Sequence, residues 1–155
     1  MNWSIDFMND SLMNGRKFRT FNVIDDYSRE VLAVEISTST PSEHVVRILD
    51  QVIDYRGKPK SIRMDNGPEF ISKTFELWCK QNNIEPRYIQ PGKPMQNGYV
   101  ERFNGSYRRD VLDAYAFFEL DEVRELTEKW MIDYNQNRPH ESLNWKTPTE
   151  YAQQG

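Results

Sequence analysis

The sequence predicts an α/β domain built on a five-stranded mixed sheet with helices on both faces. Three observations support this fold class. Apolar and polar residues alternate along residues 2–8, as in a strand with one buried face. Two further strand-like segments follow after short polar turns, which favours antiparallel neighbours. After residue 40, helical apolar spacing alternates with short strand-like segments, which is typical of parallel crossovers.

The first three strands are expected at residues 2–8, 17–25 and 30–36. In the first, Asp6 lies on the face opposite to Trp3 and Ile5, because side chains alternate along a strand. The turn before the second strand contains Asn14-Gly15, a hairpin-turn dipeptide. The third segment is apolar at nearly every position, which predicts a strand inside a covered sheet.

The later helices are located by their start signals. Thr40 is expected to cap the first helix, with Pro41 at its first position and Glu43 completing a capping box. The remaining elements are predicted in chain order as a strand at 61–64, a helix at 72–81, a strand at 84–89, a helix capped by Asn97, a long helix capped by Asp121, and a final helical turn opened by Thr147.

Length and composition bound the class of protein. At 155 residues the chain is one domain with enough material for a sizeable core. No apolar run approaches about 18 residues, so no membrane span is expected, and no secretory signal is visible at the start. The single cysteine, Cys79, excludes an internal disulfide and fits a reducing cytosol.

Three acids stand out as candidate catalytic and metal-binding residues: Asp6 on the first strand, Asp65 after the fourth, and Glu101 near the start of a helix. Thirty-five residues separate Asp65 from Glu101. Carboxylates are suitable ligands for magnesium, and two divalent ions about 4 Å apart can drive phosphodiester transfer. The turn Asn66-Gly67 leaves Asp65 at the sheet edge. Arg108, two helical turns after Glu101, projects from the same helix face and is placed to bind a phosphate.

The charge distribution is uneven along the chain. The net charge is −4, which by itself argues mildly against a nucleic-acid partner. Residues 86–109 nevertheless contain five basic residues and one acid, a net +4 that leaves −8 for the remainder. A basic window around a lone carboxylate suits a phosphate-backbone substrate, although a solvated charged face is the plain alternative.

Several stretches closely resemble the catalytic core of insertion-sequence transposases and retroviral integrases, the D,D-35-E polynucleotidyl transferases. These stretches are WSID at 3–6, VIDDYSR at 23–29, MDNGPEF at 64–70, QPGKPMQNGYVERFNG at 90–105 and YNQNRPHESL at 134–143. The last, followed by Thr147-Pro148, looks like the bacterial insertion-sequence branch and hence implies a bacterial cytoplasm. The resemblance runs over nearly the whole chain.

The resemblance implies a ribonuclease H-like fold, dependence on two Mg²⁺ or Mn²⁺ ions, and assembly of such cores into homo-oligomers on DNA. It implies hydrolysis at the ends of a mobile element, followed by attack of the freed 3′-hydroxyl on target DNA. Asp6, Asp65 and Glu101 match the three metal-binding acids of the family. The expected DNA contacts are Arg108, Arg102, Lys93, Asn66, Gln96 and Asn97.

One departure from the family pattern is that its members usually carry a helix-turn-helix region ahead of the core, whereas Asp6 is the sixth residue here. We therefore expect an isolated core with weak or absent recognition of element ends. Two alternatives stay open at this point. One is an inactive remnant that only binds DNA or oligomerises, and the other is a ribonuclease H-like nuclease acting on RNA–DNA hybrids.

Overall fold

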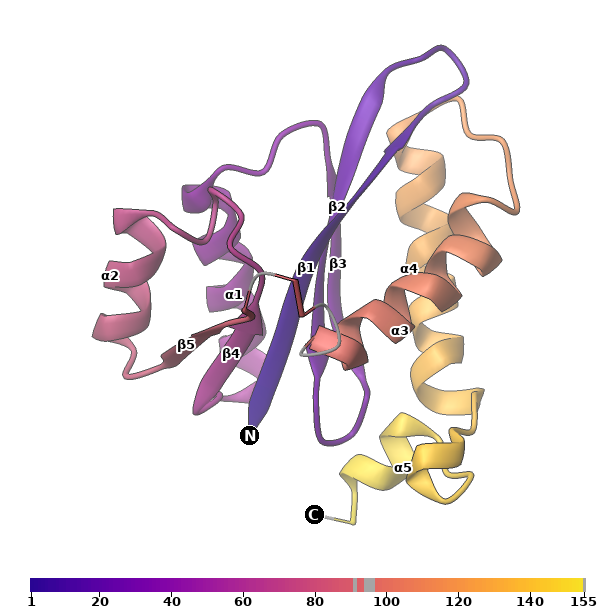
Figure 1. The fold of residues 1–155 in the computed structure, drawn as a ribbon. Coiled ribbons are helices and arrows are strands. Elements are labelled where there is room, and N and C mark those ends of the chain that lie inside the picture. Colours follow the sequence, from indigo (N-terminus) through magenta and orange to yellow (C-terminus); the bar gives the residue numbers. More distant parts are fainter. Residues whose placement is uncertain (91, 94–96, 155) are drawn as a thin grey trace.

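The computed structural model describes residues 1–90, 92–93 and 97–154, and these form a five-stranded sheet in the order β3-β2-β1-β4-β5 (Figure 1). The strands are β1 (Asn2–Ser11), β2 (Lys17–Asp25), β3 (Val31–Ser37), β4 (Ser61–Met64) and β5 (Glu85–Tyr88). The first three pair antiparallel, whereas β4 runs parallel to β1 and β5 parallel to β4. The predicted mixed sheet is confirmed.

Helices cover the two faces of this sheet (Figure 1). One layer holds α1 (Ser42–Arg56) and α2 (Lys73–Gln81), and the other holds α3 (Gly98–Tyr107) and α4 (Leu120–Asn137). A π-helical turn, η2 (Arg108–Leu112), continues α3, and η3 (Glu141–Leu143) and α5 (Pro148–Ala152) follow α4. Across the described ranges, no helix is both long and apolar enough to cross a membrane.

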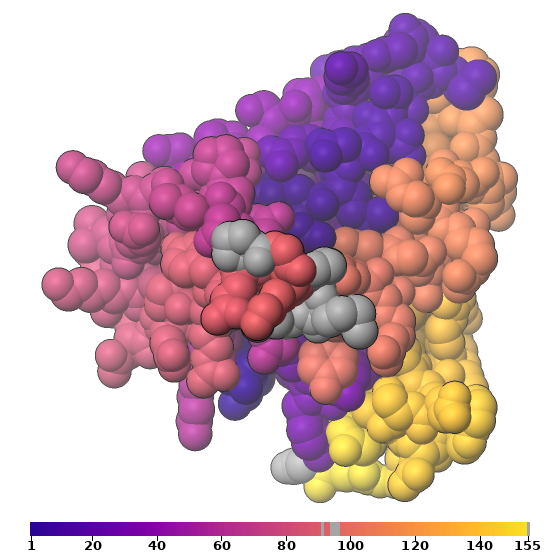
Figure 2. Space-filling model, in the orientation of Figure 1, coloured from indigo at the N-terminus to yellow at the C-terminus, as the bar shows by residue number. Residues whose placement is uncertain are grey.

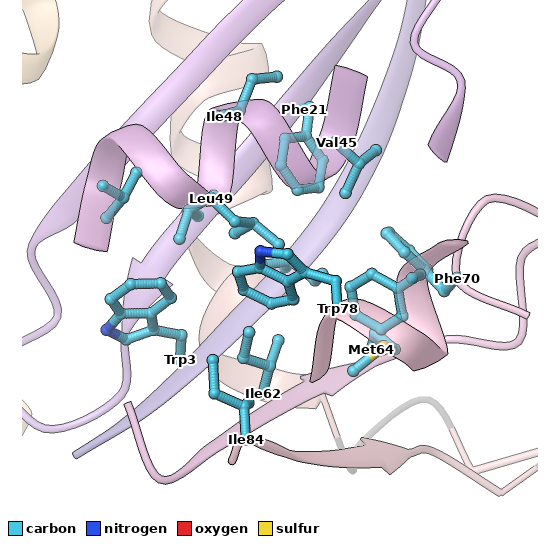
Figure 3. Close-up of a cluster of buried hydrophobic side chains, with 14 of the residues drawn as sticks. Trp3, Phe21, Val45, Ile48, Leu49, Ile62, Met64, Phe70, Trp78 and Ile84 are labelled. Atoms are coloured by element: carbon cyan, nitrogen blue, oxygen red, sulfur yellow. The ribbon is translucent and has the colours of Figure 1, made fainter. Parts of the chain in front are cut away.

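Each layer buries its own apolar core against the sheet, and strand alternation decides which side chain enters which core. Trp3 (Figure 3) is fully buried in the core under α1 and α2, and so is Ile5, whereas Met8 on the opposite face packs with the α3 and α4 layer. Burying such a side chain contributes roughly 1.5–3 kcal/mol relative to leaving it exposed. The same alternation places Asp6 on the face that α3 covers.

The prediction for the third strand was wrong in one respect. It is an edge strand rather than an interior one, since β3 pairs only with β2 among the described strands. Its apolar character has another cause: Leu32 faces the core under α1, and Val31 and Ile36 face the core under α4. A continuous apolar segment therefore indicates that helices cover both faces of the strand, and it does not indicate that the strand is central in the sheet.

The helix starts were predicted with mixed success. Thr147 forms a capping box with Glu150, as expected, and Ser72, for which no cap was predicted, caps α2. Thr40 does not cap α1, because Pro41 occupies the cap position and no side chain bonds there. The long helix begins at Leu120 and is capped by Glu119 rather than by Asp121. A glutamate, seldom favoured at this position, supplies the cap through a reciprocal bond with Glu122.

Candidate active site

Asp6 lies at the end of a short hydrogen-bonded network between the sheet and α3. Its partner in the β-ladder is Asn22 of β2, whose side chain is fully buried. The Asn104 side chain, from α3, donates through Nδ2 to Asp6 Oδ2 over 3.0 Å. Asn22 Nδ2 in turn donates to Asn104 Oδ1 over 2.8 Å. Because its oxygen is already used, Asn104 must present its amino group to the Asp6 carboxylate.

The environment of Asp6 raises its pKa from 3.8 to about 6. Burial is the largest cause, because it disfavours the charged form. Hydrogen bonds from the Phe7 backbone and from Asn104 act in the opposite direction, and the negative charges of Asp65 and Glu101 raise the pKa further. Both of the other acids are therefore close enough to Asp6 to affect its ionisation.

Asp65 follows β4 directly and is held by the turn after it. The parallel register that pairs Ser4 with Arg63 puts Asp65 level with Asp6 on the neighbouring strand. The Gly67 backbone N–H donates to Asp65 Oδ1 over 2.8 Å. A Cβ on Gly67 would lie only 3.0 Å from that oxygen, so a larger residue here would displace the Asp65 carboxylate. The expected sharp turn after Asp65 is thus present.

Glu101 lies in the first turn of α3 with an exposed side chain. It makes no hydrogen bond or ion pair with any other described residue. Within residues 1–90, 92–93 and 97–154, no group of three or more Asp, Glu, His or Cys side chains is arranged closely enough to hold a metal ion. The three acids thus interact electrostatically, but their side chains do not form a closed ligand set.

Of the basic residues expected to contact DNA, Arg108 is engaged within the chain. It donates to the Asn9 carbonyl over 3.1 Å and lies 3.6 Å from carboxylates of Asp10 and Asp113. Arg102 and Lys93 are exposed, and Arg102 has no hydrogen-bond or ion-pair partner in the described part of the chain. Arg102 is therefore the freer of the two arginines to meet an external anion.

The three expected polar contacts differ in their surroundings. Asn66 is exposed, and its Nδ2 donates to the Ile89 carbonyl over 3.1 Å, which ties the ends of β4 and β5 together. Asn97 is only 2% exposed and its Nδ2 lies 3.5 Å from the Ile5 carbonyl, which leaves little surface for DNA. Gln96 lies outside the described residues. For all of these residues, contact with DNA stays a prediction.

The sequence interpretation missed Asn22 and Asn104. Two signals were available: Asn22 interrupts the apolar run at residues 21–24, and Asn104 follows Glu101 by three positions and so lies near it on the helix surface. Neither signal identifies the partner, because that requires the strand register and the position of α3 over the sheet.

Comparison with known families agrees with this geometry. Sequence models described as Integrase core domain match residues 2–94 and residues 82–148. The first match alone spans more than half of the chain. The chain belongs to the integrase core domain family. Its five-stranded mixed sheet with helices on both faces is the fold of that core.

Several curated relatives of this integrase core are proteins of bacterial insertion elements. An uncharacterized 31.7 kDa protein of insertion element IS407 from Burkholderia multivorans is 40% identical over 97% of the chain. An uncharacterized 39.2 kDa protein of IS476 from Xanthomonas euvesicatoria is 41% identical over the same share. The matched region covers 54% and 43% of those proteins, so the chain spans about half the length of these relatives. A putative transposase of IS150 from Escherichia coli is 24% identical.

Solved structures support the fold. The integrase catalytic core domain of HTLV-2, determined in complex with magnesium, matches 97% of this integrase core and 94% of its own chain, with a TM-score of 0.72 at 24% identity. A chain of the simian T-cell lymphotropic virus intasome matches with a TM-score of 0.76 at 22% identity. At these identities the likeness concerns the fold alone.

Proposed function

We propose that this integrase core is the catalytic domain of a transposase, acting as a metal-dependent polynucleotidyl transferase. It would hydrolyse a phosphodiester bond at each end of a mobile element and then join the freed 3′-hydroxyl to target DNA. The observation that carries the proposal is the electrostatic coupling of Asp6 to Asp65 and Glu101 at the α3 face of the sheet. Similarity to insertion-element proteins supports the choice of DNA as substrate.

The chemistry of the three acids suits Mg²⁺ or Mn²⁺. All donors are hard carboxylate oxygens, and the Asn104 amide contacts one oxygen of Asp6, Oδ2. Burial is the main cause of the raised pKa of Asp6, and repulsion from Asp65 and Glu101 adds to it; a cation between the acids would offset that repulsion. Asp6, Asp65 and Glu101 would hold two ions, with the exposed Glu101 side chain turning inward. When bound, such ions activate the attacking oxygen and stabilise the leaving oxygen.

The surrounding residues would orient the acids and admit the substrate. Asn104, fixed by Asn22, holds the Asp6 carboxylate in one orientation. The Gly67 N–H does the same for Asp65. A Cβ at Gly105 would meet nothing within 4 Å, so this surface of α3 is open to a bulky DNA chain. The exposed Arg102 and Lys93 would then contact the phosphate backbone.

The direct test is strand transfer by Asp65→Asn. The assay incubates a labelled duplex bearing a free 3′-hydroxyl with a plasmid and Mn²⁺, and measures joined product together with plasmid nicking. We expect Asp65→Asn to lose at least about 100-fold in rate, the scale for removing one group that stabilises a transition state. Asp54→Asn, the same change at an exposed site on α1, serves as the matched control and should behave as wild type. Strand transfer by Asp65→Asn at the wild-type rate would overturn the proposal.

Two further readouts separate the alternatives. A ribonuclease H-like nuclease would cleave an RNA–DNA hybrid faster than duplex DNA and would join nothing. An inactive remnant would show no change in thermal stability when Mg²⁺ or Mn²⁺ is titrated. A catalytic core instead gains stability with metal, because the ion binds only the folded state.

A further inference from the structure

A basic cleft adjoins the helix that carries Glu101, and apart from Arg102 its lining residues have no role in the function proposed above. It has a volume of about 660 Å³ and lies between α3 with η2, the end of α4, and the coil at residues 138–142. Figure 2 shows the orange surface of α3 and η2 meeting the yellow surface of the C-terminal region. The polar side chains that line it include Arg102, Ser106, Arg109, Arg138, His140 and Ser142.

The arginines of this cleft are only partly neutralised. Arg138 Nη2 lies 2.5 Å from Asp110 Oδ2, and Arg109 Nε lies 3.5 Å from the other oxygen of the same carboxylate. One carboxylate is thus shared between two guanidinium groups. The Arg109 side chain is 70% exposed, and Arg102 has no partner among the described residues. The only acid in the described lining of the cleft is Glu141, against three arginines.

His140 lines the same cleft, and the positive charge of the arginines affects its pKa. Its ring packs edge-on against Tyr134 with centroids 5.2 Å apart, and its Nε2 is buried without a hydrogen-bond partner within the described ranges. Burial lowers the pKa of His140, and the charges of Arg138, Arg29 and Arg102 lower it further. Of these three arginines, Arg138 and Arg102 also line the cleft.

We propose that this cleft binds the phosphate backbone of the DNA substrate, so that the coil at residues 138–142 is part of the DNA interface. The proposal rests on the proposed function, which supplies DNA as the substrate. Guanidinium groups match phosphate oxygens in a bidentate geometry, and the hydroxyls of Ser106 and Ser142 are further donors. The chemistry proposed at the three acids does not require these guanidinium and hydroxyl donors, so they are available to bind DNA.

The position of the cleft fits a single bound duplex. Arg102 is next to Glu101 in the chain, and Arg109 lies eight residues beyond Glu101, about 12 Å along a helix. That distance corresponds to about four nucleotides of one strand at roughly 3.4 Å each. A DNA strand engaged at the acids can therefore reach the cleft. The charge of −4 on the whole chain makes this local basic surface the favoured approach for a polyanion.

The first test measures DNA binding without metal. Fluorescence anisotropy of a labelled 30-base-pair duplex is recorded in EDTA at several salt concentrations for wild type, Arg102→Gln, Arg109→Gln and the double variant. Each lost phosphate contact should make the slope of log affinity against log salt less negative by about 0.9 and weaken binding about five-fold near 0.15 M salt. The matched control is Arg47→Gln, the same charge change at an exposed position of α1.

An unchanged salt slope in the double variant would overturn the proposal. An equal loss of DNA affinity in Arg47→Gln would also overturn it, because it would show an effect of net charge only. Arg138 is left intact, because its bond to Asp110 joins α4 to η2 and its removal would disturb the fold. Since EDTA excludes the metal-dependent reaction, the outcome is independent of the strand-transfer test. Loss of strand transfer with normal binding, or the reverse, separates the two proposals.

A second test uses the two histidines of the chain as reporters. In NMR spectra, the imidazole signals of His140 should shift when duplex DNA is added in EDTA, while those of His44 on α1 stay in place. Inorganic phosphate at matched ionic strength distinguishes a backbone site from a site for a free anion. An equal response to phosphate at low millimolar concentration, or no response of His140 to DNA, would contradict binding of the backbone.

Discussion

Replacing Asp6 by Asn should stabilise the metal-free protein, which is the opposite of what most buried substitutions do. The pKa of Asp6 is raised from 3.8 to about 6, and each pKa unit corresponds to 1.36 kcal/mol. Ionised Asp6 therefore disfavours folding by at most about 3 kcal/mol. Asparagine keeps the shape and an acceptor for Asn104 but carries no charge. We expect a gain of about 1–3 kcal/mol in the free energy of unfolding at pH 7.5.

The gain should depend on pH in a defined direction. Below pH 3.8 the carboxyl is protonated in both states, so the charge has no effect on the free energy of unfolding. Between pH 3.8 and about 6 the folded protein retains a proton that the unfolded chain has lost, so the penalty from Asp6 grows. Above about pH 6 the penalty is constant. The advantage of Asp6→Asn should thus be full at pH 7.5 and absent near pH 3.5.

Urea denaturation in EDTA at the two pH values measures this difference. Asp10→Asn, the same change further along β1, is the matched control, because Asp10 lies 3.6 Å from Arg108 and its replacement removes a favourable charge pair. It should give no gain. Added Mg²⁺ should reduce this advantage, since 100 times the dissociation constant stabilises the wild type by about 2.7 kcal/mol and the variant less. A metal-free Asp6→Asn protein no more stable than wild type at pH 7.5 would refute the reasoning.

The remaining predictions concern the turn, the core and the cysteine. Gly67→Ala should reduce strand transfer with little change in urea midpoint, because the new Cβ would lie 3.0 Å from Asp65 Oδ1; wild-type activity would count against this. Ile5→Ala should lower the free energy of unfolding by about 2–5 kcal/mol, against about 0.5 kcal/mol or less for the exposed Ile132→Ala; similar losses would contradict the assigned core. Burial raises the pKa of the Cys79 thiol to about 12, so it should react with a disulfide reagent only after unfolding, and rapid labelling of the native protein would be inconsistent with that burial.

The faces of β1 could be read from the sequence because alternation in a strand is strict. Trp3 and Ile5 enter one core and Asp6 faces the other side, as predicted. The edge position of β3 could not be read in this way, because an apolar strand covered by helices on both faces has the same pattern wherever it lies in the sheet. The capping signals were also ambiguous. The order Thr40-Pro41 fits a cap followed by the first helical residue, but the helix begins at Ser42, one residue later than predicted.

The candidate acids were predicted from their spacing and flanking motifs. The fold brings Asp65 and Glu101 close enough to raise the pKa of Asp6. The network that orients Asp6 was not predicted. Asn22 meets Asp6 only through the register of β1 and β2, and Asn104 meets both only through the packing of α3 on the sheet. Such long-range polar contacts join residues about 80 to 100 positions apart, and no local pattern encodes them.

The most direct measurement of the central claim is a crystal structure of this chain grown with Mn²⁺, in which anomalous scattering locates the metal. The account predicts manganese within about 2.3 Å of carboxylate oxygens of Asp6 and Asp65, with Glu101 turned from its exposed position to bind the same pair of ions. Manganese absent from Asp6 and Asp65 at saturating concentration, or bound there while Glu101 stays exposed, would contradict it.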